Sequence, residues 1–291
     1  MNPSLWSLAV GPFEAFGFMR QASVGLIALA VAQGPIGALL LLRRQSLVGD
    51  LLSHAAMPGA ALGFLAAGYS IFAMSLGGVV TGLAVGGLAG LIGRWSPERR
   101  EASLAAFYLV ALALGVVIVS AYGSNADLMH VLFGTVLAID LRGLLLIATV
   151  SSVSILVLAA IYRPLAVDSF DPAFLRAVGA GGGIFRAIFV VLVILNLVAS
   201  FQALGTLLAI APMLLPAAAA RCWARQVSPI IALSVALGIV ADYIGLLVSY
   251  YANLPSGPAI VLAGGAIYGL SLLLAAPIEL VRNAALGEKQ G

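Results

Sequence analysis

An aspartate and a histidine four residues apart form the strongest chemical signal in the sequence. They are Asp50 and His54, in the stretch Gly49-Asp50-Leu51-Leu52-Ser53-His54. On a helix, side chains four residues apart share one face, with their Cβ atoms about 5–6 Å apart. A carboxylate and an imidazole so placed suit a divalent cation such as Zn²⁺, Mn²⁺ or Fe²⁺, which accepts mixed nitrogen and oxygen ligands. Two ligands do not complete a site, so we expect others from elsewhere.

Pro58 strengthens this hypothesis, because proline lacks the N–H that would bond the carbonyl of His54 in a helix. A free carbonyl at membrane depth is tolerated where it lines a cavity or is buried in protein. The structural alternative is that Asp50 favours the N-terminus of a helix that starts at Ser46, while His54 bonds a neighbouring helix. Ionisable residues inside membrane segments are rare and usually functional, which favours the metal hypothesis.

Asp242 is a further candidate ligand, whereas His130 has another expected role. Asp242 lies inside another apolar run and could supply a third ligand, pair with an arginine, or lie near the outer interface. His130 lies near Asp127 in a short segment, where contact with solvent or a partner is the expected role. Cys222 is the only cysteine, which excludes an intrachain disulfide and a cysteine-rich metal site.

The elements that must position these side chains are membrane helices. The 291 residues are 63% hydrophobic and 9% charged, whereas about 25% of the residues in an ordinary globular protein are charged. A soluble surface cannot be made from this composition. We expect a single transmembrane domain over residues 1–291, without a removable signal peptide at its N-terminus.

Nine apolar stretches are long enough to span a bilayer, which takes about 20 helical residues. Placing the basic clusters between them in the cytoplasm puts the N-terminus outside and the C-terminus inside, with Arg20 as a misfit. The segment 126–139 is too short to span, and is expected at the outer surface or as a re-entrant segment. We predict an all-α integral membrane protein, a polytopic bundle of about eight or nine transmembrane helices, near 16–42, 46–67, 70–93, 101–122, 141–162, 182–202, 204–222, 228–250 and 257–281.

Four glycines recur every four residues in the third stretch: Gly78, Gly82, Gly86 and Gly90. Together they leave one helix face without side chains. Small residues at this spacing let membrane helices approach closely, so we expect tight helix packing. The functional alternative is a pathway lined by exposed carbonyls.

A short helix is predicted between the fifth and sixth stretches. Asp171 before Pro172 favours a helix start, and Gly179 favours its end. The apolar face of this helix consists of Phe174, Leu175 and Val178. The residues alone leave two roles equally open, since such a helix can lie on the membrane surface or dock into a groove of a partner.

Several function classes are excluded by missing motifs. A Walker A motif needs a lysine in GxxxxGK[ST], and Lys289 is the only lysine, so the chain has no ATPase site of that kind. The two histidines form no HExxH motif, and no Ser–His pair for proteolysis is evident. We therefore expect no enzyme, and no nucleic-acid partner, because there is no basic stripe on a soluble face.

Five blocks of the sequence resemble the membrane permease of the manganese/zinc/iron-type metal-ion ABC transporters, a family of bacterial uptake systems. The blocks occur in the family's order and together extend over nearly the whole chain, at residues 39–65, 127–139, 162–179, 201–225 and 245–262. The resemblance implies a multi-pass protein of the bacterial inner membrane that translocates Mn²⁺, Zn²⁺ or Fe²⁺ and binds no permanent cofactor. It also implies a cytoplasmic ABC ATPase subunit, an extracytoplasmic metal-binding protein and a second copy of the permease as partners within the lipid bilayer.

The resemblance further assigns roles to residues. The family's intramembrane metal position falls on Asp50 and His54. Segment 164–179 becomes the helix that couples the permease to the ATPase, which favours the partner groove over the membrane surface. Its residues expected to serve this coupling are Asp171, Phe174, Leu175, Arg176 and Val178.

Asn253 departs from the family pattern, because many relatives carry an acidic residue there. Metal reception at the outer mouth is therefore expected to be weaker or to occur elsewhere. Asp242 is unusual for the family as well. A proton-coupled secondary metal carrier or a metal channel is the alternative function, and the choice of metal stays open because Asp and His serve all three cations.

Overall fold

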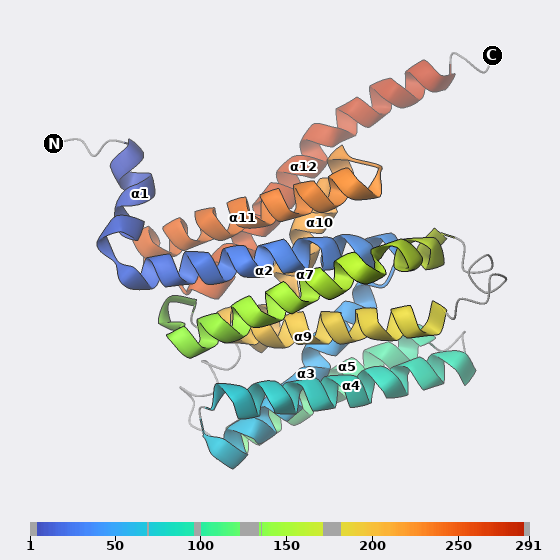
Figure 1. The fold of residues 1–291 in the computed structure, drawn as a ribbon. Helices are drawn as coiled ribbons and strands as arrows, with labels where there is room; N and C mark the ends of the chain where they lie inside the picture. The colour runs from blue at the N-terminus through green and yellow to red at the C-terminus, as the bar shows by residue number, and fades with distance from the viewer. Residues whose placement is uncertain are drawn as a thin grey trace.

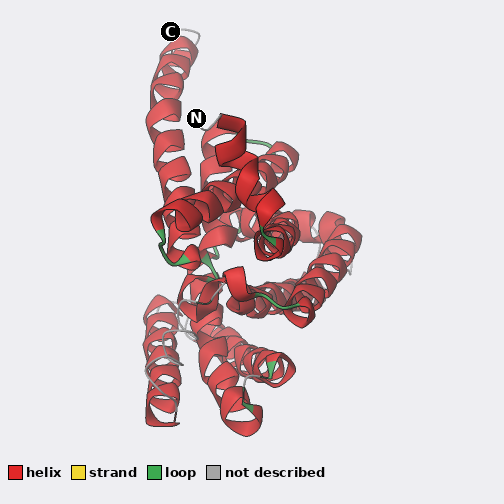
Figure 2. Ribbon diagram, turned by 90° about the vertical axis from the view of Figure 1, so that its left-hand side faces the viewer, coloured by secondary structure: helices red, strands yellow, loops and turns green. Residues whose placement is uncertain are grey.

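The computed structural model describes residues 5–68, 70–95, 100–122, 134, 136–170 and 182–287. These residues are helical and contain no strand. Figure 2 shows the helices joined by short loops. In chain order the elements are α1 (Leu5–Ala15), α2 (Gly17–Leu42), α3 (Ser46–Ala67), α4 (Ile71–Trp95), α5 (Arg100–Tyr122), the 3₁₀ turn η2 (Val136–Ala138), α7 (Leu141–Phe170), α9 (Gly182–Leu208), α10 (Ala211–Trp223), α11 (Val227–Ala252) and α12 (Ser256–Gly287).

Each of the nine predicted spans corresponds to a helix in this series. Seven helical stretches of the described chain are long and apolar enough to cross a bilayer. The two predicted spans outside this set are α3, whose hydropathy is lowered by Asp50 and His54, and α5, which contributes the shorter apolar stretch Leu109–Ala121. The predicted all-α membrane bundle is confirmed, and its helix count agrees roughly with the predicted eight or nine.

The helices form three groups (Figure 1). Helices α2, α7 and α9 run through the middle of the bundle, with α2 against α7 and α7 against α9. Helix α3 packs against α4 and α5 on one side of this middle group. On the other side, α10, α11 and α12 pack against one another, and α10 and α11 also contact α2. Helices α3 and α11, which carry the predicted metal ligands, therefore belong to different groups.

The largest buried cluster joins the groups. It brings together apolar side chains from α2, α3, α7, α9 and α10, among them Ile36, Leu52, Leu165, Phe189 and Met213. Burying such side chains in one cluster fixes how these five helices pack, because protein interiors are close-packed. The cluster therefore sets the position of α3 relative to the rest of the bundle.

Helix α7 extends further than the sequence predicts. It continues through Pro164 to Phe170, whereas the predicted span ends at residue 162. Leu165 is fully buried in the core and Asp168 is buried beside arginines of two other helices. These tertiary contacts hold the last turns of α7 in helical form despite the proline.

The end of segment 126–139 packs into the bundle. Val136 in η2 is fully buried, and η2 contacts α2, α9 and α12. Gly134 lies against Gly205, where α9 is interrupted, and both have positive φ angles, of 62° and 75°. A Cβ atom on Gly134 would lie 2.3 Å from the Gly205 nitrogen, so no larger residue fits there without a shift. His130 and Asp127 lie outside the described residues.

Candidate metal site

Asp50 and His54 lie on one face of α3, near the start of the helix. The His54 Nε2 atom is 3.6 Å from the Asp50 Oδ1 atom. This distance is too long for a hydrogen bond. Two donor atoms that share one cation at about 2.1 Å lie roughly 3–3.5 Å apart, so a small rotation of either side chain would let both bind the same ion.

The two side chains differ in exposure. The imidazole of His54 is 6% exposed and the carboxylate of Asp50 is 43% exposed. The histidine side chain is therefore buried within the bundle, while the aspartate carboxylate is partly exposed on the surface of the single chain. A cation at Asp50 would have an open side on which further ligands can bind.

Helix α3 is fixed against the junction of α9 and α10. The Ser53 hydroxyl donates a hydrogen bond to the Thr206 carbonyl over 3.3 Å. Thr206 follows Gly205, whose φ of 75° and ψ of 172° interrupt α9. Because Ser53 precedes His54, this bond orients the part of α3 that carries the metal pair.

Pro58 does not break α3. The helix runs without interruption from Ser46 to Ala67 and contains the proline. The His54 carbonyl still lacks its usual helical hydrogen bond, because Pro58 has no N–H to donate to it.

Asp242 is not brought to the Asp50–His54 pair. It lies on α11, buried to 5% exposure, in a small pocket whose other lining residues include Pro212, Pro216 and Gly238. Within the described part of the chain, no three His, Cys, Asp or Glu side chains are placed to share a metal ion. A third ligand from Asp242 of the same chain therefore finds no support in the geometry.

Asn253 has a conformational role. It ends α11 in the left-handed region, with φ of 52° and ψ of 39°. Asn tolerates this conformation better than most other residues. The departure from the family pattern at this position is thus compatible with the local backbone.

Three of the four predicted packing glycines face neighbouring helices. A Cβ atom added to Gly78 would lie 3.2 Å from Val198, and one added to Gly82 would lie 3.0 Å from Ile194. A Cβ atom added to Gly86 would lie 2.9 Å from Leu52. These neighbours belong to α9 and α3. Gly90 lies on α4, but its surroundings are outside what the structure describes.

The closest approach of α3 and α4 occurs at another pair of glycines. A Cβ atom on Gly59 would lie 2.0 Å from the Gly77 carbonyl oxygen, and one on Gly77 would lie 2.1 Å from the Gly59 oxygen. Gly63 is similarly close to Ala73. Sequence reasoning missed this crossing, although Gly59 and Gly63 have the small-xxx-small spacing that indicates it.

A buried polar network links α2, α7 and α9. The Asn196 amide donates to the Ser154 hydroxyl at 2.7 Å and to the Leu192 carbonyl at 2.8 Å. Gln33 donates to the hydroxyl of Ser200 and, at 3.3 Å, to the Asn196 carbonyl. Such bonds hold membrane helices together, and no local sequence pattern revealed them.

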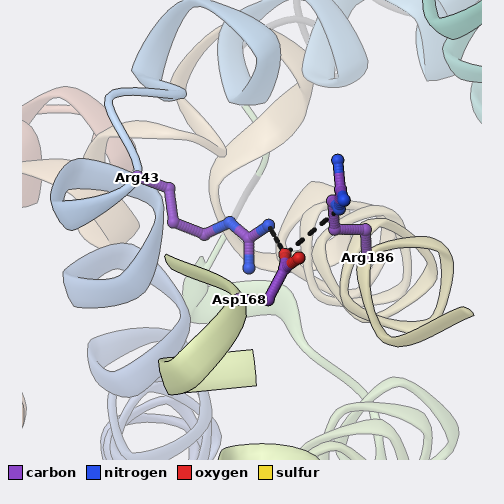
Figure 3. A network of polar contacts seen from close by, with 3 residues as sticks. All are labelled: Arg43, Asp168 and Arg186. Carbon is purple, nitrogen blue, oxygen red and sulfur yellow. Dashed lines mark hydrogen bonds and ion pairs between the residues drawn. The ribbon is translucent and has the colours of Figure 1, made fainter. Parts of the chain in front are cut away.

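A second cluster of charges was also missed. Asp168 near the end of α7 accepts a hydrogen bond from Arg43 Nη2 at 2.8 Å, and Arg186 Nε forms an ion pair with the same Oδ2 atom at 3.1 Å (Figure 3). Asp168 is 2% exposed, Arg43 6% and Arg186 49%. We call these three residues the charge cluster. No local spacing could have revealed it, because Arg43 and Asp168 are 125 residues apart in the sequence.

The predicted coupling residues cannot be placed. Helix α7 ends at Phe170 and α9 begins at Gly182. The intervening residues lie outside the described part of the chain, and they include Asp171, Phe174, Leu175, Arg176 and Val178.

Comparison with known proteins gives consistent results across the length of the chain. Residues 15–275 match the model of the ABC 3 transport family. The manganese import system permease protein ScaB of Streptococcus parasanguinis is 32% identical, over 90% of this chain and 92% of its own length. The manganese transport system membrane protein MntC of Listeria innocua is 31% identical, over 89% of this chain and 91% of its own.

Solved structures agree with the sequence comparison. A chain of PsaBC from Streptococcus pneumoniae, in complex with Fab, superposes with a TM-score of 0.81 at 29% identity, covering 90% of this chain and 94% of that one. An inward-facing metal-chelate type ABC transporter superposes with a TM-score of 0.69 at 14% identity, covering 93% of this chain and 92% of that chain. The second likeness concerns the fold alone.

Proposed function

Because this chain belongs to the ABC 3 transport family, we propose that it is the membrane permease of an ATP-driven manganese importer. The family resemblance drawn from the sequence is confirmed, as is its localisation as a multi-pass protein of the plasma membrane. Relatives whose names state manganese import or transport, and which align over about nine tenths of the chain, support manganese as the cargo.

The observation that carries the proposal is the Asp50–His54 pair. Its donor atoms are 3.6 Å apart on one helix face, close to the separation that a shared cation requires. A hard carboxylate oxygen with one imidazole nitrogen suits Mn²⁺, which favours oxygen-rich coordination. Zn²⁺ and Fe²⁺ share these ligands and have no comparable support from the named relatives.

A second copy of the permease would complete the metal site. One chain supplies a carboxylate and an imidazole, which is fewer ligands than a divalent cation takes. Asp50 is 43% exposed in the single chain and is therefore open to a partner. We propose that the cation passes between two copies, each of which contributes its Asp50 and His54, and that Asp242 lies outside this site.

The energy for transport would come from other subunits. The chain has no lysine in a Walker A motif, so ATP would be hydrolysed by a cytoplasmic ABC ATPase. We propose that this subunit docks on the part of segment 164–179 that follows the end of α7 at Phe170, through the coupling residues between α7 and α9. A separate extracytoplasmic metal-binding protein would deliver the cation, and the permease itself would make no covalent change.

Reconstitution separates this proposal from a proton-coupled carrier. Proteoliposomes containing the permease and its ATPase subunit should accumulate Mn²⁺ only when ATP is supplied on the ATPase side. The permease alone should accumulate none under an imposed proton gradient. Accumulation by the permease alone, driven by that gradient, would contradict the proposal and favour the secondary carrier.

A further inference from the structure

We propose that the charge cluster of Arg43, Asp168 and Arg186 transmits movement of the ATPase-docking segment to the metal-binding helix α3. The inference rests on the proposed function, because it assumes that the segment between α7 and α9 docks on an ATPase. It assigns Arg43, Asp168 and Arg186 as positioning residues, which act on the metal through α3 and do not contact it.

The three side chains come from the elements that such a link must join. Asp168 lies in the last turn of α7 and Arg186 in the first turns of α9, so they flank the proposed docking segment on both sides. Arg43 ends α2 and is separated from the start of α3 by two residues. One carboxylate oxygen thus holds together both ends of the docking segment and the turn before α3 (Figure 3).

The turn from Arg43 to α3 is fixed by hydrogen bonds, so a displacement of Arg43 would also displace the start of α3. The Arg44 amide donates to the Leu41 carbonyl at 3.1 Å and the Gln45 amide to the Leu40 carbonyl at 2.9 Å. Arg44 takes a left-handed φ of 54°. This is the bonding pattern of a Schellman motif, which fixes the chain direction after a helix. A shift of Arg43 is therefore carried directly into the first turns of α3, where Asp50 lies.

The two arginines are held unequally. Arg43 is 6% exposed, and its guanidinium carbon also lies 5.7 Å from the centre of the Phe189 ring on α9. Arg186 is 49% exposed and can exchange Asp168 for water. Arg43–Asp168 is thus the permanent contact of the charge cluster, and Arg186–Asp168 is the contact that can open when the docking segment moves.

The carboxylate of Asp168 uses only one of its two oxygen atoms to contact the arginines. Both arginines bond its Oδ2 atom, whereas its Oδ1 atom is buried without a hydrogen-bond partner among the described residues. A buried acceptor left unpaired is costly. Among the described residues Oδ1 is thus open to a further donor, so Asp168 can hold more than one set of partners.

The test is the number of Mn²⁺ ions imported per ATP hydrolysed, in proteoliposomes that contain the permease with its ATPase subunit. Asp168→Asn and Arg43→Gln should each lower this ratio about tenfold, within the usual range of couplings between distant sites. Bound ATPase and hydrolysis without Mn²⁺ should stay as in the wild type. Arg44→Gln is the matched control, because it removes a charge in the same turn without any ion pair to the described residues, and its ratio should be unchanged.

Two further variants distinguish coupling from simple stabilisation. The double variant Arg43→Gln with Asp168→Asn leaves only the half-exposed Arg186 without its partner, so it should regain most of the melting temperature lost by the single variants. Its Mn²⁺ to ATP ratio should remain low. Arg186→Gln, at the exposed position, should assemble normally yet lower the ratio, and Arg186→Lys should restore it in part.

A wild-type ratio in folded Asp168→Asn or in Arg186→Gln would overturn the inference. A double variant that regains both its stability and the wild-type Mn²⁺ to ATP ratio would overturn the inference too. The charge cluster would then only stabilise the packing of the helices. Failure of the proposed function looks different, since the wild-type complex itself would then show no ATP-dependent uptake.

Discussion

The separation of Asp50 and His54 favours metal binding over a stabilising role. At 3.6 Å the imidazole and the carboxylate do not form a hydrogen bond with each other. Asp50 is also 43% exposed, and ion pairs with exposed partners contribute little to stability. Two ionisable residues kept on a membrane helix for so little stabilisation are better explained by a cation that binds both.

Replacing Asp50 and Asp242 in turn by asparagine separates the metal site from the rest of the bundle. Asp50→Asn should weaken Mn²⁺ binding at least roughly 10–100-fold, the loss that even a changed outer-shell residue causes at metal sites. Asp242→Asn is the matched control and should leave binding unchanged, because Asp242 lies on α11 away from the pair. Electron paramagnetic resonance of Mn²⁺ measures both affinities, using the purified permease in lipid nanodiscs.

Equal losses in the two variants would contradict this account, because they would make Asp242 a ligand. Unchanged binding in both would remove Asp50 from the metal site. Either result is informative because the two substitutions make the same chemical change at two separate places in the membrane domain.

At the residue scale, the sequence predicted the pair but not its surroundings. The spacing of Asp50 and His54 is local, and the periodicity of a helix converts it directly into a shared face. The hydrogen bond from Ser53 to Thr206 joins residues 153 positions apart. Such contacts follow from helix packing, which local spacing does not specify.

Glycines, which have no side chain, also help to position helix α3. At Gly59 and Gly77 the backbones of α3 and α4 approach so closely that a Cβ on either would lie about 2 Å from a carbonyl oxygen of the other. Gly78, Gly82 and Gly86 continue this close contact toward α3 and α9. Helix α3 is therefore held against α4 by close backbone contact at Gly59 and Gly63.

Gly77→Ala should destabilise the permease by about 1–3 kcal/mol, the usual cost of inserting a methyl group into a well-packed site. Gly87→Ala on the same helix is the control, because nothing lies within 4 Å of its added Cβ atom. The control should be neutral or slightly stabilising, since alanine favours helix over glycine. Thermal unfolding in detergent measures both, and equal melting temperatures would show that the crossing at Gly77 is not tight.

At the element scale, apolar length predicted the helices well and their ends less well. The nine stretches were visible because each spans a bilayer with few charges. The extension of α7 past Pro164 was not, because it depends on the burial of Leu165 and on the partners of Asp168. The docking residues 171–179 stay a prediction, since they lie outside the described chain.

At the scale of the whole molecule, the single chain lacks ligands that a transported cation needs. Its described residues offer two metal ligands in one place and no third. Large apolar side chains such as Phe72, Leu262 and Leu273 face outward, as suits contact with lipid. We propose that a second copy and an ATPase supply what the single chain lacks, and that the ATPase acts next to the charge cluster.

The most direct test of the central claim is the rate of ATP-dependent Mn²⁺ uptake by His54→Gln. The variant and the wild type are compared in proteoliposomes with the ATPase subunit, at equal amounts of assembled complex. The account predicts that uptake by the variant falls at least roughly 10–100-fold while ATP hydrolysis continues. Uptake at the wild-type rate would contradict it, because the cation would then cross the membrane without the Asp50–His54 pair.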